Sequence, residues 1–367
     1  MGCWASYIYH GVSMIDRTDV FTSGEDGVWI YRNPALAATG SGAVLLFCEA
    51  RQVPAPGVHG DYAPASLVLR RSTDGGVSWG PTQVLATNPH GAAHNPTPVH
   101  DPATGAVHFL YGLDYEHLYY TRTDDGGATF TDPIDITSIA LEFRSEYNWK
   151  AFATGIGHAI VLSTGRIVVP VWMALGTQGP HRPSVVASIY SDDAGRTWER
   201  GELLPQTLRN PSETQPVELG DGRVLFSIRN ESPERRRAWS VSPDGATGWS
   251  SPRFDPALFE PICCAAILRA QLDGRSAVVY LHPDPPEPVL TPPTADRNHL
   301  TLRASFDDCR TWPVARLVDP GIAGYSDLAQ AADGTLLCAY GRGTIDGNPW
   351  HKKHVSVARV EPGWLLA

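Results

Sequence analysis

The segment Ser72-Thr73-Asp74-Gly75-Gly76-Val77-Ser78-Trp79 is the first of several copies of one pattern, Ser-x-Asp-x-Gly-x-Thr-Trp, and these copies decide the fold. We call each copy an Asp-box. Three more copies occupy residues 123–130, 191–198 and 305–312, and a looser one occupies residues 242–249. Repetition at intervals of roughly 50 to 65 residues indicates a repeated supersecondary unit, and strand-rich repeats of that size are typical of propeller blades. The sequence therefore predicts an all-β propeller.

Each Asp-box also predicts a particular turn. An Asp in a tight turn accepts hydrogen bonds from backbone N–H groups two residues further on, while Gly supplies a positive φ. The closing Trp is expected to pack beneath the turn as a hydrophobic plug. We therefore expect the Asp residues of the boxes to be structural rather than catalytic. Two substitutions, Cys309 in place of Gly and Gly248 in place of Thr, mark loosened copies.

Length and composition fit one β-rich domain. A propeller of five or six four-stranded blades would use all 367 residues, 1–367, as a single domain. The chain holds 35 Gly and 31 Pro, as expected of a protein rich in turns. Its net charge of −10 disfavours nucleic acid or an anionic membrane surface as the main partner. The sequence does not predict the oligomeric state.

Signals for a metal, a leader or a membrane anchor are weak. The six cysteines show no metal-ligand spacing, and the adjacent pair Cys263-Cys264 is expected to be buried as free thiols. Residues 1–20 lack the apolar region of a secretory signal, and no apolar run is long enough to span a membrane. We expect a cytoplasmic protein, or a secreted one whose leader is absent from this sequence. The start, Met1-Gly2-Cys3-Trp4-Ala5-Ser6, matches the short N-myristoylation pattern, which also arises by chance.

Three further segments predict local structure. Residues 354–360 read as a strand that pairs with an N-terminal strand and closes the ring. Residues 139–150 are expected to form a short helix or an irregular excursion, and the proline-rich residues 283–293 a stiff surface loop.

Segments between the boxes resemble the bacterial-type exo-sialidases (neuraminidases), six-bladed β-propeller glycosidases with Asp-boxes, or BNR repeats, that cleave terminal sialic acid. The resemblance runs from about Asp19 to the C-terminus. The matching segments occur in the family's order: Tyr31-Arg32-Asn33-Pro34, Phe47 to Ser72 with Asp61, Glu213 to Asn230, Arg297 to Arg303, and Gly324-Tyr325-Ser326. The resemblance implies a single six-bladed β-propeller with exo-α-sialidase activity. Its expected partners are sialylated glycans or related 2-keto-3-deoxy sugar acids.

The resemblance implies an anion-binding group of three arginines, Arg32, Arg229 and Arg297, on different blades. Guanidinium groups bind a carboxylate by charge-assisted, partly bidentate hydrogen bonds, and sialic acid carries a carboxylate on its anomeric carbon. Each arginine alone is equally consistent with a surface salt bridge, so their joint placement carries the interpretation. Arg51 and Asn95 fall where the family contacts the O4 side of the sugar.

The resemblance also implies catalytic roles for Tyr325 as nucleophile, Glu213 as its base and Asp61 as acid and base. Sialidases are an exception among glycosidases in using a Tyr nucleophile. The carboxylate of the substrate would repel a carboxylate nucleophile but does not repel a neutral phenol. Asp61 needs a raised pKa, which desolvation by residues 53–64 could supply. The ordinary alternatives are a core aromatic for Tyr325 and solvated loop carboxylates for the two acids. No cofactor or metal is expected, because no His/Asp ligand cluster appears at coordination spacing.

One position departs from the family pattern. The family has a Glu after the late Tyr of the penultimate strand, where it supports the first arginine, but here Gly341 follows Tyr340. Arg32 would lack its partner, and we expect another acid, such as Asp327, to replace it. The departure leaves open a preference for Kdn or Kdo, transfer rather than hydrolysis, and a catalytically silent propeller that binds glycans or proteins.

Overall fold

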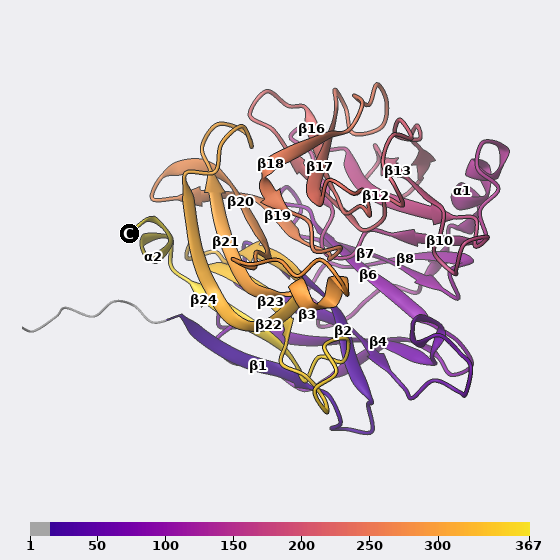
Figure 1. Cartoon of the computed structure of the whole chain (residues 1–367), viewed down its shortest axis with the longest axis horizontal. Coiled ribbons are helices and arrows are strands. Elements are labelled where there is room, and N and C mark those ends of the chain that lie inside the picture. The colour runs from indigo at the N-terminus through magenta and orange to yellow at the C-terminus, as the bar shows by residue number, and fades with distance from the viewer. Residues whose placement is uncertain (1–14) are drawn as a thin grey trace, which may run out of the picture.

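The computed structural model describes residues 15–367, and this part of the chain is almost entirely β-structure (Figure 1). Its helices are short: α1 (Thr137–Glu142), α2 (Pro362–Leu366) and three 3-10 turns, η1 (Gly60–Tyr62), η2 (Phe143–Ser145) and η3 (Pro293–Asp296). Within residues 15–367 no helix is long and apolar enough to cross a membrane. The all-β prediction is confirmed. The myristoylation-like pattern Met1–Ser6 lies outside the described residues.

The strands of residues 15–367 form five sheets. The first contains β2 (Ile30–Ala38), β3 (Val44–Arg51), β4 (Ala65–Ser72) and β5 (Gln83–Asn88). The second contains β6 (Ala93–His100), β7 (Val107–Leu113), β8 (His117–Thr123) and β9 (Ile134–Asp135). The third contains β10 (Ala151–Thr154), β11 (Ile160–Val161), β12 (Ile167–Ala174), β13 (Ser184–Ser191) and β14 (Glu199–Arg200). The fourth contains β15 (Thr214–Glu218), β16 (Val224–Ile228), β17 (Arg236–Ser242) and β18 (Arg253–Phe259).

The fifth sheet has seven strands in the order β1-β24-β23-β22-β21-β20-β19. Its members are β1 (Asp16–Thr22), β19 (Ala266–Leu272), β20 (Arg275–Pro283), β21 (Asn298–Ser305), β22 (Val314–Gln330), β23 (Leu336–Arg342) and β24 (His354–Val360). The long strand β22 pairs with β21 through its first half and with β23 through its second half. Strand β1 pairs antiparallel with β24, which confirms the pairing predicted for residues 354–360 (Figure 1).

The Asp-boxes form the turns that follow β4, β8, β13, β17 and β21. In the first box the Asp74 carboxylate accepts hydrogen bonds from the backbone N–H groups of Val77 (3.2 Å) and Ser78 (2.9 Å) and from the Ser78 hydroxyl. The donors therefore lie three and four residues on, not two as expected. The box carboxylates accept hydrogen bonds within their own turns, which confirms that their role is structural.

The two substituted boxes both keep a turn held by the Asp carboxylate, but they do so in different ways. Cys309 adopts the left-handed conformation of the Gly it replaces (φ 65°). In the box of residues 242–249, Asp244 bonds the N–H groups of Ala246 (2.9 Å) and Thr247 (2.8 Å), so this turn is one residue tighter. Thr247 thus takes the place that Gly248 leaves empty.

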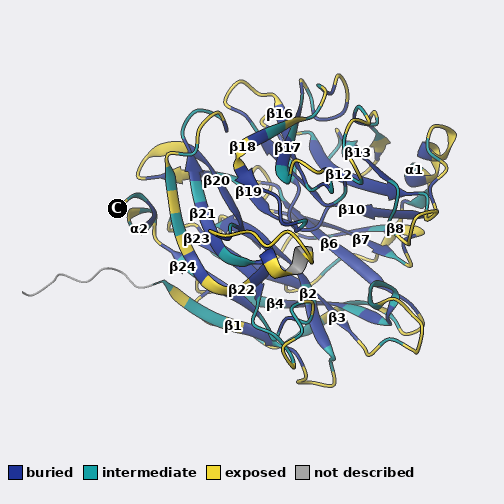
Figure 2. Cartoon of the chain, in the orientation of Figure 1, coloured by how far each residue is buried: buried dark blue, intermediate teal, exposed yellow. Residues whose placement is uncertain are grey.

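Buried residues are concentrated on the strands (Figure 2), and the apolar ones among them form clusters between neighbouring sheets. Leu45 and Phe47 of the first sheet pack with Phe109 of the second, and Leu110 of the second packs with Val169 of the third. In the same way the third sheet packs against the fourth, and the fourth against the fifth. The first sheet also packs against β23 and β24 of the fifth sheet. Cys263 and Cys264 are buried free thiols, as predicted, and so are Cys48, Cys309 and Cys338.

Asp327 on β22 joins three sheets near their inner strands. Its fully buried carboxylate accepts hydrogen bonds from the Leu36 backbone N–H (2.7 Å), from the N–H (2.9 Å) and ring Nδ1 (2.7 Å) of His158, and from Gln215 Nε2 (3.0 Å). Both oxygens are thus occupied by β2, β15 and the segment between β10 and β11. The prediction that Asp327 supports Arg32 is therefore wrong.

We predict that Asp327→Asn lowers the free energy of unfolding by about 3 kcal/mol, because an amide NH₂ would face buried donors and leave them unsatisfied. Chemical denaturation followed by fluorescence measures the change. The control is Asp124→Asn, since Asp124 pairs only with Arg122 at the surface and should contribute below about 0.5 kcal/mol. Equal stability of the two variants would contradict the role assigned to Asp327.

Candidate active site

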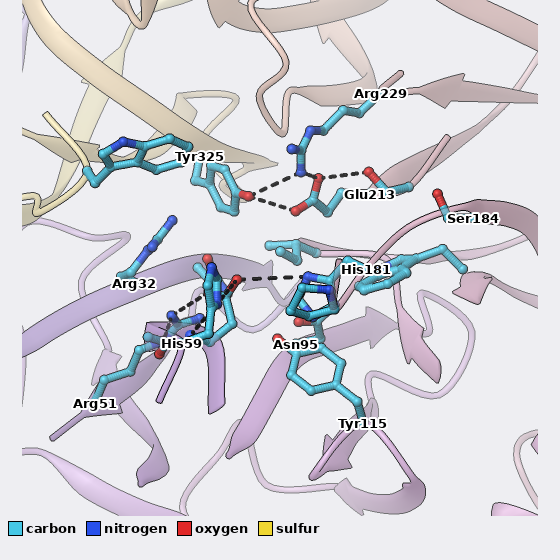
Figure 3. Close-up of a pocket in the computed structure, with 18 of the residues that line it drawn as sticks. Arg32, Arg51, His59, Asn95, Tyr115, His181, Ser184, Glu213, Arg229 and Tyr325 are labelled. Carbon is cyan, nitrogen blue, oxygen red and sulfur yellow. Dashed lines mark hydrogen bonds and ion pairs between the residues drawn. The ribbon is translucent and has the colours of Figure 1, made fainter. Parts of the chain in front are cut away.

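A cavity of about 370 Å³ opens among loops and strands of several sheets. Seven residues proposed from the sequence line it: Arg32, Arg51, Asp61, Asn95, Glu213, Arg229 and Tyr325 (Figure 3). They come from β2, β3, η1, β6, the ends of β15 and β16, and β22. Arg297 is the exception, because it lies outside the lining. Residues far apart in sequence thus converge on one pocket.

Backbone irregularities in three strands aim side chains at this pocket. Strands β2, β6 and β22 each carry a register shift, after Arg32, after His94 and after Gly324. At these points Asn33 (φ 55°), Asn95 (φ 52°) and Tyr325 (φ 54°) adopt the left-handed conformation, which costs a non-Gly residue about 1–3 kcal/mol. A β-bulge redirects the side chain that it carries. Three such bulges therefore turn Asn33, Asn95 and Tyr325 toward the same cavity.

Tyr325, Glu213 and Arg229 form a connected set on one wall (Figure 3). The Tyr325 hydroxyl donates to Glu213 Oε1 (2.7 Å), and Arg229 Nη1 bonds both Glu213 Oε2 and the Tyr325 oxygen, the latter at 3.3 Å. Burial, reinforced by the Glu213 carboxylate, raises the pKa of the Tyr325 phenol above its usual value. Burial acts to raise the pKa of Glu213, but the charge of Arg229 and the hydrogen bonds from Tyr325 and Arg229 together outweigh burial and lower that pKa. An ionised base therefore accepts a hydrogen bond from a neutral phenol.

Two further guanidinium groups flank the Tyr325 ring. That of Arg32 lies 5.3 Å and that of Arg297 5.4 Å from the ring centroid. Arg32 makes no ion pair with a carboxylate among residues 15–367, so its donors are available to a ligand. Arg297 is buried, bonds the Ile262 carbonyl and lies 4.8 Å from the Trp350 ring. Arg297 therefore adds positive charge next to Tyr325 without lining the cavity itself.

Asp61 lies in a second polar network around Arg51. Arg51 Nη1 donates to Asp61 Oδ1 at 2.7 Å, while Arg51 Nε donates to the buried Glu49 carboxylate at 2.8 Å. Glu49 also accepts from Asn33 Nδ2 (2.6 Å) and the Asn95 N–H (2.8 Å), which gives the atypical Asn33 a structural partner. Burial acts to raise the pKa of Asp61, but Arg51 and then Arg32 outweigh it and hold the pKa well below its usual range. The raised pKa expected for Asp61 from the sequence is therefore wrong.

Other lining residues were not identified from the sequence. His181 Nδ1 lies 3.8 Å from Asp61 Oδ2, and its ring packs on Tyr115 and Trp172. Arg182 pairs with Glu231, which also accepts from Asn210 Nδ2 (2.8 Å). Except for Trp172 on β12, these side chains lie on loops. None of them carries a repeat or spacing signal, so only the folded chain brings them together.

Taken together, the repeats and the pocket define an all-β protein with a site that contains arginines, carboxylates and a tyrosine. The family model described as a BNR repeat-like domain matches residues 64–338. A sialidase of Micromonospora viridifaciens is 30% identical over 366 residues, which cover 91% of this chain and 53% of that protein. The fold resembles the Hadza microbial sialidase Hz136 (TM-score 0.74, 21% identity, 92% of this chain and 67% of that one) and a Trypanosoma rangeli sialidase (TM-score 0.73, 18% identity, 96% and 60%).

The chain belongs to the bacterial-type sialidase family of BNR-repeat proteins. It spans about half the length of the curated relatives it matches. The family resemblance found in the sequence is confirmed.

We predict that His181 stays neutral at pH 7. Burial lowers its pKa to about 4, although Asp61 acts to raise it. Removing that negative charge by Asp61→Asn should lower the pKa further, whereas Asp124→Asn, a surface change, should leave it unaltered. Proton NMR titration, with the His181 signal assigned from a His181→Gln variant, measures both. A wild-type pKa near 6.5, or no response to Asp61→Asn, would contradict the described burial and contact.

Proposed function

We propose that the protein is a retaining exo-glycosidase that hydrolyses terminal α-linked sialic acid, with Tyr325 as its nucleophile. The observation that carries this proposal is the Tyr325–Glu213–Arg229 set, which lies across the same cavity from Asp61 and beside Arg32. Two negative charges, the substrate carboxylate and an attacking carboxylate, would repel each other. A phenol that becomes charged only as it loses its proton to Glu213 avoids that cost.

The first half of the reaction forms a covalent intermediate. Arg32 and Arg229 bind the substrate carboxylate by charge-assisted hydrogen bonds. The Tyr325 proton moves to Glu213 Oε1, 2.7 Å away, as the phenol oxygen attacks the anomeric carbon. The bond to the aglycone breaks, and its oxygen takes the Asp61 proton. The sugar is then joined to Tyr325 through a C–O bond.

The second half restores the enzyme. Asp61, now ionised, takes a proton from water, whose oxygen attacks the anomeric carbon while Tyr325 leaves and recovers its proton from Glu213. Two displacements give net retention. Asp61 must take its proton from solvent before the first half begins. Bound substrate favours this protonation, because the sugar carboxylate neutralises Arg32, one of the cations that lower the pKa of Asp61.

We propose further that the five sheets are a single six-bladed propeller over residues 1–367. Five units end in a strand–Asp-box–strand turn, and the sixth would combine the second half of β22 with β23, β24 and β1. Support comes from the apolar layers, which join each sheet to the next and the last to the first. Arg51 and Asn95 would then border the sugar's O4 side.

Hydrolysis of a fluorogenic α-sialoside tests the mechanism. We expect wild-type turnover and a loss of kcat of about a thousandfold or more in Tyr325→Phe, since the nucleophile is removed, with a large loss in Asp61→Ala. The matched control is Tyr190→Phe, because Tyr190 donates to Glu199 (2.8 Å) away from the cavity. Full activity of Tyr325→Phe would contradict the nucleophile, and inactivity of the wild type would favour a binding protein.

Substrate identity is tested with the same assay. The Trypanosoma rangeli sialidase forms complexes with 2,3-difluorosialic acid and 2,3-difluoro-KDN. We therefore include glycosides of Kdn and Kdo and expect sialosides to have the highest kcat/KM. A higher value for Kdn or Kdo would reassign the substrate without changing the mechanism.

Removal of the unpaired arginine tests carboxylate recognition. We predict that Arg32→Met raises KM by about ten- to a hundredfold, the loss of hydrogen bonds to a charged group. Arg122→Met, which removes a surface guanidinium paired with Asp124, should change KM less than about twofold. An unchanged KM in Arg32→Met would show that the substrate carboxylate binds elsewhere.

A further inference from the structure

A buried lysine that the proposed mechanism does not use lies near Arg32 and Arg297. These two arginines flank the Tyr325 ring, and we call them the arginine wall. Lys352, in the connection from β23 to β24, is 7% exposed, and the two residues before it, Trp350 and His351, line the cavity. Its ammonium donates to the Pro349 carbonyl (2.6 Å), and no carboxylate lies within 4 Å of it among residues 15–367. Lysine is seldom buried without an opposite charge.

A pair of glycines makes room for this side chain. Gly324 and Gly341 face each other across β22 and β23, so side chains added there would project from the same face. A Cβ on Gly341 would lie 2.9 Å from Lys352 Cγ, and one on Gly324 would lie 3.5 Å from Arg297 Cβ and 3.2 Å from Cys263 Sγ. The Lys352 stem therefore fills the space beside Gly341. Gly324, which pairs with Gly341, lies beside Arg297 and directly precedes Tyr325.

The surroundings of Lys352 are positively charged. The charged or titratable groups that act on it are Arg297 at the start of β21, Cys263 between β18 and β19, and Arg32 on β2. Gly341 of β23 lies beside its stem and carries no charged side chain. Burial, followed by repulsion from Arg297, lowers the pKa of the Lys352 amine to about 7. A bound anion would relieve that repulsion and favour the charged amine.

We propose that Lys352 is a positioning residue that supplies an additional buried positive charge to the arginine wall and strengthens the binding of anionic substrate when its amine is protonated. It acts through the field at Arg32 and Arg297 and does not touch the sugar. This inference rests on the proposed function of the same cavity. It also gives Gly341 a role, because any larger residue there would displace the lysine stem.

The sign of the pH dependence follows from the amine. The substrate carboxylate is ionised throughout pH 6 to 8, whereas Lys352 loses its charge as pH rises through about 7. Affinity should therefore fall, and KM should rise, over this interval. Burial, followed by the charge of Arg32, lowers the pKa of His351 on the same connection, so His351 loses its charge at a lower pH than Lys352.

The test compares Lys352→Met with the wild type by kinetics from pH 6 to 8. At pH 6 we expect KM to rise about fivefold to tenfold in the variant, as for loss of one charge at an effective dielectric near 20, with kcat within about threefold. KM of the variant should then be independent of pH. The matched control is Lys353→Met, because the Lys353 ammonium donates to the Ser23 carbonyl and does not act on Arg297. A Lys352→Gln variant repeats the test if the first does not fold.

Calorimetry gives a readout that a merely structural role would not change. An unsaturated sialic acid analogue is titrated at pH 7.5 in two buffers of different ionisation enthalpy. The wild type and Lys353→Met should take up a larger part of a proton on binding than Lys352→Met, in which only uptake by groups other than Lys352, such as Asp61, remains. Identical KM profiles and proton uptake in Lys352→Met and wild type would overturn the proposal while leaving the proposed function intact. A wild type that neither binds the analogue nor hydrolyses sialosides would overturn both the Lys352 proposal and the proposed function. If the wild type binds the analogue without hydrolysing sialosides, the comparison of proton uptake alone tests the role of Lys352.

Discussion

The buried carboxylate of Asp327 is the constraint on which the rest of the molecule depends. It accepts hydrogen bonds from β2, from the segment after β10 and from β15, and it lies two residues after Tyr325 on β22. Strands that come from distant parts of the chain are therefore fixed at the level of the cavity. Because buried donors are costly to leave unsatisfied, the network tolerates only one arrangement of these strands.

That fixed frame allows strained backbone to persist at the site. Asn33, Asn95 and Tyr325 keep left-handed conformations at bulges whose neighbours are held by hydrogen bonds, as when Asn33 and Asn95 both bond Glu49. The result is a division of charge within one cavity. One wall holds a neutral phenol, its ionised base and cations, and the other holds Asp61 paired with Arg51. Preorganised charge of this kind is the main resource of an enzyme that stabilises a charged transition state.

The sequence was sufficient for features that follow a pattern. The Asp-boxes predicted the all-β repeats and their turns, and the family's segments located Arg32, Asp61, Glu213, Arg229 and Tyr325, which the fold brings to one cavity. It was insufficient where a role depends on neighbours that only folding supplies. Asp327 reads as an ordinary strand residue, the low pKa of Asp61 depends on Arg51, and Lys352 becomes notable only because Gly341 leaves space for its stem.

Trapping the covalent intermediate tests the central claim most directly, which is that Tyr325 attacks the anomeric carbon. Fluorine next to that carbon slows the release of a glycosyl–enzyme, so 2,3-difluorosialic acid should accumulate as an adduct. Peptide mass spectrometry of the labelled protein should find one fluorosialosyl group, on the peptide that contains Tyr325 and on its phenol oxygen. An adduct on Glu213 or Asp61, or sialoside turnover with inversion and no adduct, would contradict the account.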